Sequence, residues 1–213
     1  MSCPICGKRP PKRYCPAKGE KICAVCCGRE REVTIDCPVD CPHLLAAHRY
    51  EKEHRKPIPP EQFPYPDVEF SVHFVQEHWH IVAGFAATIL GFQLQNKELN
   101  DSDSLSALEA LAETFRTLGT GIYYEKPPAS PLPRALYGHL ATFIQDFKKQ
   151  DAGRAGFSTV KDSEIFHLLI FLLRVGKQES NGRPRTRTFL GFLRTQFPLP
   201  AEAEKEAPRI IMP

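Results

Sequence analysis

Apolar positions in the C-terminal two thirds of the chain recur at helical spacing. Between Glu69 and Gln95, large apolar residues return every three or four positions, which is typical of a helix that buries one face. The chain shows no β pattern, no internal repeat and no Gly-rich phosphate loop. The helical spacing also predicts four further helices, over residues 102–118, 131–149, 159–177 and 187–196.

The residues before this region have a different character. A helical pattern runs from Cys41 to His54 with Asp40 as the candidate N-cap, and the next segment is rich in proline, which favours a linker. The last residues are rich in Pro, Ala and Glu. The sequence therefore predicts a mostly α protein with a Cys-rich finger and its trailing helix at 1–55, a Pro-rich linker at 56–68, an α-helical bundle at 69–197 and a flexible tail at 198–213.

All eight cysteines lie between Cys3 and Cys41. An even number also suits disulfides, but pairs at C-x2-C spacing in a chain with no recognisable signal peptide favour metal-binding thiolates. A structural zinc ion takes four ligands in a tetrahedron, and cysteine thiolates are common ligands in such sites. Eight thiolates therefore predict two structural zinc ions as the cofactors.

The spacing divides the cysteines into two interleaved sets. In a C-x2-C pair both sulfurs reach one ion, so the two such pairs are expected to form the first site: Cys3, Cys6, Cys23 and Cys26. The other four are enough for a second site: Cys15, Cys27, Cys37 and Cys41. Interleaved sets describe a cross-brace, in which the adjacent Cys26 and Cys27 bind different ions.

Two alternatives to this assignment stay open. His43 could replace Cys37 or Cys41 as a ligand, although its position favours the first turn of the next helix. A sequential arrangement would instead place Cys15 on the first ion. Gly7 and Gly28 each follow a cysteine, where a metal-binding turn needs a residue that tolerates positive φ.

The cysteine motifs resemble a known class of zinc finger. Cys3-x2-Cys6, Tyr14-Cys15-Pro16, Cys23-x2-Cys26 and the closing Cys37 and Cys41 are similar to the HIT-type, treble-clef-like fingers that bind two zinc ions in a cross-brace. The resemblance implies a protein-interaction module, but Cys15 lacks its usual partner two or three residues on, so Cys27 would substitute. Ile22-Cys-Ala-Val-Cys-Cys-Gly28 with Ile35-Asp-Cys-Pro38 also looks like an uncharacterised bacterial zinc-finger family, which implies no activity.

The charge of the finger is easily misread. Residues 1–60 carry a formal charge of +5, which is typical of nucleic-acid binding. Eight bound thiolates add eight negative charges and two zinc ions add four positive ones, which lowers this value to +1 and that of the whole chain from +3 to −1. Three roles are therefore open for the basic side chains here: they compensate the negative charge of the metal sites, they contact nucleic acid, or they attract an acidic protein. A second basic run, Arg183 to Arg194, is the better candidate for nucleic acid.

Membrane insertion and catalysis receive little support. The apolar run from Ile165 to Val175 is too short to span a bilayer, and the expected location is the cytoplasm. Two Glu-x-x-His motifs, Glu77 to His80 and Glu164 to His167, are of the kind that helical bundles use for di-iron sites. Their residues fall on polar faces, which favours solvent exposure over metal binding.

These observations predict a non-enzymatic, zinc-binding interaction or adaptor protein whose finger docks onto another protein. A nucleic-acid-binding protein that uses Arg183–Arg194 together with the finger is the first alternative. A metal-dependent enzyme with its site in the bundle is the second. The sequence does not indicate the oligomeric state.

Overall fold

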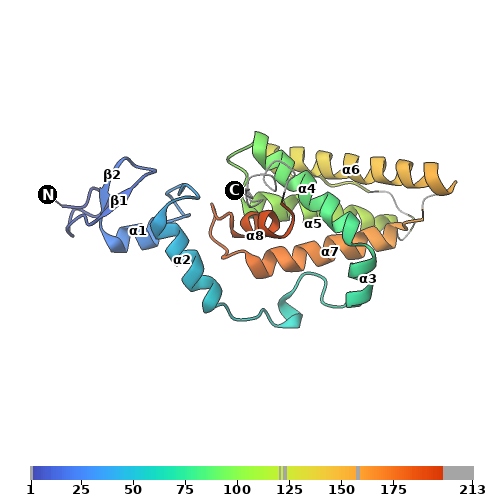
Figure 1. Ribbon diagram of the computed structural model, residues 1–213, viewed down its shortest axis with the longest axis horizontal. Coiled ribbons are helices and arrows are strands. Elements are labelled where there is room, and N and C mark those ends of the chain that lie inside the picture. The colour runs from blue at the N-terminus through green and yellow to red at the C-terminus, as the bar shows by residue number, and fades with distance from the viewer. Residues whose placement is uncertain (1, 120, 122–123, 157–158, 199–213) are drawn as a thin grey trace, which may run out of the picture.

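The computed structural model describes residues 2–119, 121, 124–156 and 159–198. They form a small Cys-rich finger at one end of an elongated molecule and a larger group of helices at the other (Figure 1). The predicted fold class, mostly α with a small Cys-rich region at the N-terminus, is confirmed. The predicted tail lies outside the described residues except for Pro198. None of the described helices has the length and apolar character needed to cross a membrane.

The finger combines a short hairpin with a short helix. Strands β1 (Arg13–Cys15) and β2 (Glu20–Ile22) pair antiparallel, with Tyr14 opposite Lys21. The expectation that the chain contains no β structure was wrong, because strands of three residues are too short to show an alternation of apolar and polar residues. Helix α1 (Ala24–Glu30) follows β2 directly, and Cys23 is its N-cap.

The bundle confirms the predicted helices but changes two of them. The helix predicted over 69–95 begins at Val72 and is interrupted at His78, whose φ of −98° and ψ of 15° depart from helical values. The helix predicted to end near residue 149 continues to Ala155. The helices are α3 (Val72–Glu77), α4 (Trp79–Gln95), α5 (Asp101–Leu118), α6 (Pro131–Ala155), α7 (Asp162–Glu179) and α8 (Thr188–Gln196).

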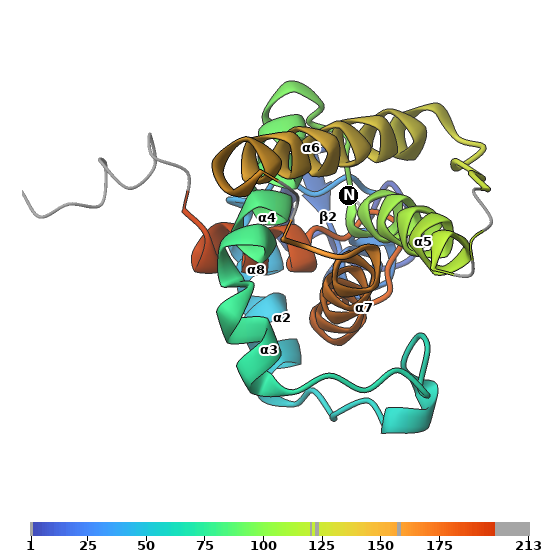
Figure 2. The same ribbon diagram turned by 90° about the vertical axis from the view of Figure 1, so that its right-hand side faces the viewer.

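One apolar core joins the bundle helices. The long helices α4, α5, α6 and α7 are grouped around it, and α8 lies against them (Figure 2). Each of these five helices contributes side chains that are fully removed from solvent. Examples are Phe85, Leu108, Leu140, Leu169 and Phe189. A second, smaller cluster in the finger consists mainly of cysteines with Ile22 and Ile35.

Asp101 fixes the position of α8 against α5. Its carboxylate is buried at the start of α5 and accepts hydrogen bonds from the backbone N–H groups of Phe189 and Leu190, at 3.0 and 3.2 Å. The hydroxyl of Thr188 also donates to it at 3.1 Å. The first N–H groups of a helix lack partners within the helix, so Asp101 acts as a cap supplied by a distant segment.

The segment between finger and bundle is attached to the bundle along its length. The N-cap position of helix α2 (Pro42–Glu53) is occupied by Cys41 and not by the expected Asp40, and a single turn, η1 (Pro60–Gln62), follows. Arg174 of α7 donates hydrogen bonds to the carbonyls of Pro64, Tyr65 and Val68. The predicted linker is therefore an ordered connection held by a bundle arginine.

Candidate metal centre

Four cysteine sulfurs meet inside the finger. The sulfurs of Cys3, Cys6, Cys23 and Cys26 all lie within 4.8 Å of one another, and all but Cys6 are buried. Sulfurs bound at about 2.3 Å to a tetrahedral zinc ion lie about 3.8 Å apart. The Sγ atoms of Cys6 and Cys23 are 4.0 Å apart. This set is the first of the two sites predicted from the sequence, and its residues fit a metal ion.

Local backbone structure brings these sulfurs together. Cys3 and Cys6 belong to a tight turn in which Gly7 adopts the expected positive φ of 64° and donates its N–H to the carbonyl of Cys3. Cys23 and Cys26 lie at the start of α1, where the N–H of Cys26 points to the Cys23 sulfur at 3.4 Å. The hairpin between the two pairs returns the chain to the same place.

The thiols differ in their tendency to ionise. Backbone N–H groups of Lys8 and Arg9 lower the pKa of Cys6 to about 6. Burial and the neighbouring thiols raise the pKa of Cys26 to about 12. Four thiolates in one buried cluster repel one another, so full ionisation of this set requires a cation between them.

The remaining four cysteines surround one small cavity. Cys15, Cys27, Cys37 and Cys41 all line a space of about 10 Å³, together with His43. Burial raises the pKa of Cys37, and the nearby Cys41 and Cys15 raise it further. Within the described part of the chain, only the first set has its ligand atoms within 4.8 Å of one another.

Two expectations about single residues have different outcomes. His43 is in the first turn of α2, as expected, and it also lines the small cavity. Gly28 lies inside α1 and does not have the positive φ that was expected, so this prediction was wrong. The reason is that α1 begins at the second C-x2-C pair and continues past Cys27.

The Glu-x-x-His motifs have other partners in the bundle. Glu77 pairs with His73 at 3.2 Å on an exposed surface. Glu164 caps the backbone N–H of Lys161 at the start of α7. The ring of His167 packs against Phe70 and Phe74, and its burial lowers its pKa.

The basic run from Arg183 connects the bundle to the finger. The guanidinium of Arg183 donates to the carbonyls of Gly28 and Arg31, at 3.2 and 2.6 Å. Arg187 forms an ion pair with Asp36 at 2.7 Å. These two side chains therefore already bind the segment that leads from α1 to the last cysteines.

A buried carboxylate at this junction was not predicted from the sequence. Glu32 is only 2 % exposed and has a φ of 55°, and its carboxylate contacts His48 Nε2 and Asn181 Nδ2, each at 3.0 Å. Its carbonyl accepts the N–H of Arg185 at 2.9 Å. Burial raises the pKa of Glu32, but hydrogen bonds from His48 and Asn181 outweigh it, so the net pKa is lowered. No sequence motif marks this contact, because Asn181 lies 149 positions after Glu32.

Comparison of the chain with protein-family models, with curated proteins and with solved structures finds no match.

Proposed function

We propose that this protein is a non-enzymatic interaction protein whose finger is held in shape by two structural zinc ions. The observation that carries the proposal is the buried group of four sulfurs formed by Cys3, Cys6, Cys23 and Cys26. A second ion would occupy the cavity lined by the other four cysteines, as in the cross-brace of HIT-type fingers. Zinc suits four thiolates because it is a borderline-soft ion without redox chemistry of its own. Thiolates that hold zinc must stay reduced, which agrees with a cytoplasmic location.

Elemental analysis of the purified protein is expected to give two zinc ions per chain. Cys26→Ser should release one ion and Cys27→Ser the other, since the cross-brace assigns them to different sites. The double variant Cys3→Ser with Cys26→Ser should lose no more zinc than either single variant, because both changes affect one site. One zinc per chain in the wild type would contradict the second site, and release of the ion by His43→Ala would make His43 a ligand.

Exposed apolar side chains favour the finger and α2 as the docking surface. Of the ten large apolar side chains that are exposed in the described part of the chain, six lie between residues 14 and 50. Tyr14 and Val25 are 57 % and 44 % exposed, although both belong to the secondary structure of the finger. Exposed aromatic and aliphatic groups on a rigid scaffold are typical of protein-binding surfaces.

Capture of a protein partner from the native cell tests this surface. Tyr14→Ala combined with Val25→Ala should reduce recovery of the partner by about tenfold or more, a loss of at least 1.4 kcal/mol of binding free energy. Val72→Ala is the matched control, because Val72 is 75 % exposed but lies on the bundle. Both proteins must retain their zinc. Equal recovery with both variants would refute docking through the finger.

A further inference from the structure

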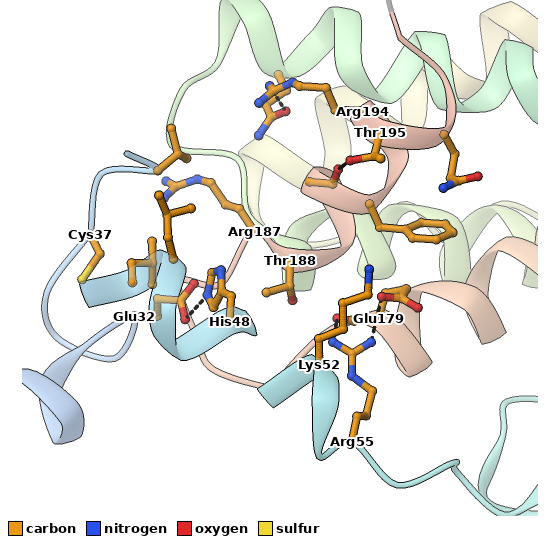
Figure 3. Close-up of a pocket in the computed structure, with 17 residues that line it drawn as sticks. Glu32, Cys37, His48, Lys52, Arg55, Glu179, Arg187, Thr188, Arg194 and Thr195 are labelled. Carbon is orange, nitrogen blue, oxygen red and sulfur yellow. Dashed lines mark hydrogen bonds and ion pairs between the residues drawn. The ribbon is translucent and has the colours of Figure 1, made fainter. Parts of the chain in front are cut away.

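A cavity of about 460 Å³ lies between the finger and the bundle. One wall is α2 and the other is α8, and the loop that carries Cys37 and Val39 forms one end (Figure 3). Ligand pockets of proteins commonly have volumes of about 300–1,000 Å³. The cavity is therefore large enough for a small organic molecule, and Cys37 is the one cysteine that lines it.

Part of the cavity surface is apolar. Leu44 and Leu45 of α2 and Phe192 of α8 line it, and Val39 adds an apolar group from the finger loop. Leu45 and Val39 are 50 % and 60 % exposed, so these side chains present apolar surface to solvent. A ligand with an apolar body would remove this surface from water, which stabilises the complex.

The charged groups of the cavity are unequal in number. Four Lys and Arg side chains line it, against two Glu side chains. The cations outnumber the acids of the lining even though Arg55 pairs with Glu179 at 2.8 Å and Arg187 pairs with Asp36 at 2.7 Å, and Glu32 contacts His48 at 3.0 Å. The cavity therefore presents an excess of positive charge to a molecule that enters it.

Lys52 is the cation best placed to meet such a molecule. Its side chain extends from α2 into the space between α2 and α8 (Figure 3). Among the described residues, no carboxylate lies within 4.0 Å of its ammonium group. The nearby Arg31 and Arg55, in contrast, form ion pairs with Glu51 and Glu179. An ammonium beside an apolar surface favours a ligand that carries a negative charge at one end.

We propose that this cavity binds a small organic anion, with its apolar body between Leu45 and Phe192 and its acidic group at Lys52. The site shares only Cys37 with the cysteine clusters, and its binding role goes beyond the docking role of the finger. Because the finger loop forms one end of the cavity, a bound anion would contact the finger and the bundle at once.

Gly191 offers a way to close the cavity without disturbing the fold. It lies within α8 and lines the cavity, and a Cβ added there would meet no atom within 4 Å. Gly191→Leu should therefore fill the space while it favours the helix. Gly138→Leu is the matched control, because Gly138 is an equally open glycine in α6 and does not line the cavity.

The test uses the zinc-loaded full-length protein and two fluorescent probes, 8-anilinonaphthalene-1-sulfonate and its uncharged analogue N-phenyl-1-naphthylamine. The sulfonate is expected to bind saturably at one site, and Gly191→Leu should weaken it by about tenfold or more, whereas Gly138→Leu should not. Lys52→Met should weaken the sulfonate several-fold and leave the uncharged probe unchanged. Lys149→Met, at an exposed position of α6, is the control for loss of a positive charge.

Each other outcome overturns the proposal. Absence of saturable binding excludes an organic-anion site of this kind. Binding that survives Gly191→Leu with unchanged affinity places the probe elsewhere. Equal affinity for the charged and uncharged probes, or an unchanged affinity of Lys52→Met for the sulfonate, would show that the negative charge of the ligand does not contribute to binding. Circular dichroism and zinc content of every variant must match the wild type, so that a loss of binding is not a loss of the finger.

Discussion

Removal of zinc by an excess of chelator is expected to unfold the finger while the bundle keeps most of its helical signal. The finger core consists of cysteines and two isoleucines, Ile22 and Ile35, which is too little apolar surface to keep a module of this size folded. Structural zinc contributes on the order of 10–16 kcal/mol in finger peptides. The bundle has a separate core from five helices and holds none of the cysteines.

Far-UV circular dichroism and limited proteolysis measure this difference. After chelation, cleavage should concentrate within residues 1–41, and the near-UV signal of Trp79, the single tryptophan, should persist because it reports on the bundle. The melting temperature of the bundle should fall, since Arg183, Arg187 and Asn181 lose their partners in the finger. Collapse of the whole helical signal on chelation would show that finger and bundle fold as one unit.

Asp101→Ala should lower the free energy of unfolding of the bundle by about 2–4 kcal/mol. The change removes three hydrogen bonds at once and leaves the buried N–H groups of Phe189 and Leu190 without partners. Burial raises the pKa of Asp101, and these N–H groups oppose that rise. Urea denaturation followed by circular dichroism gives the loss of stability.

Asp103→Ala is the matched control for Asp101, because it removes a carboxylate from the same first turn of α5. Its side chain accepts a single N–H, that of Asn100 at 3.4 Å, and it does not reach α8. The expected cost is about 0.5–1 kcal/mol. Equal losses in the two variants would mean that the contact between Asp101 and α8 contributes nothing beyond an ordinary helix cap.

The metal centre could be predicted because its chemistry is local. A C-x2-C pair brings two sulfurs together within one turn, so Cys3 with Cys6 and Cys23 with Cys26 were recognisable from spacing alone. The helices of the bundle were recognisable for a similar reason, since each buries one face at a period of 3.6 residues. The assignment of the second ion stays a prediction, because Cys15, Cys37 and Cys41 have no such pairing motif.

The contacts between segments could not be predicted. Asp101 looks like an ordinary first-turn acid of α5, and nothing near it in the sequence points to α8 about 90 residues later. Arg174 looks like a break in an apolar run, yet it binds carbonyls of the Pro-rich segment more than 100 residues earlier. Tertiary hydrogen bonds of this kind depend on how helices pack, and the periodicity of a single helix carries no information about its partner.

The contact from Arg183 to α1 affects the order in which the chain can be completed during synthesis. Helix α1 carries cysteines of both sets, and the carbonyls of Gly28 and Arg31 at its end are bound by a guanidinium more than 150 residues later. A protein emerges from the ribosome with its N-terminal part first. The carbonyls of Gly28 and Arg31 therefore gain the guanidinium of Arg183 only after the bundle has been translated.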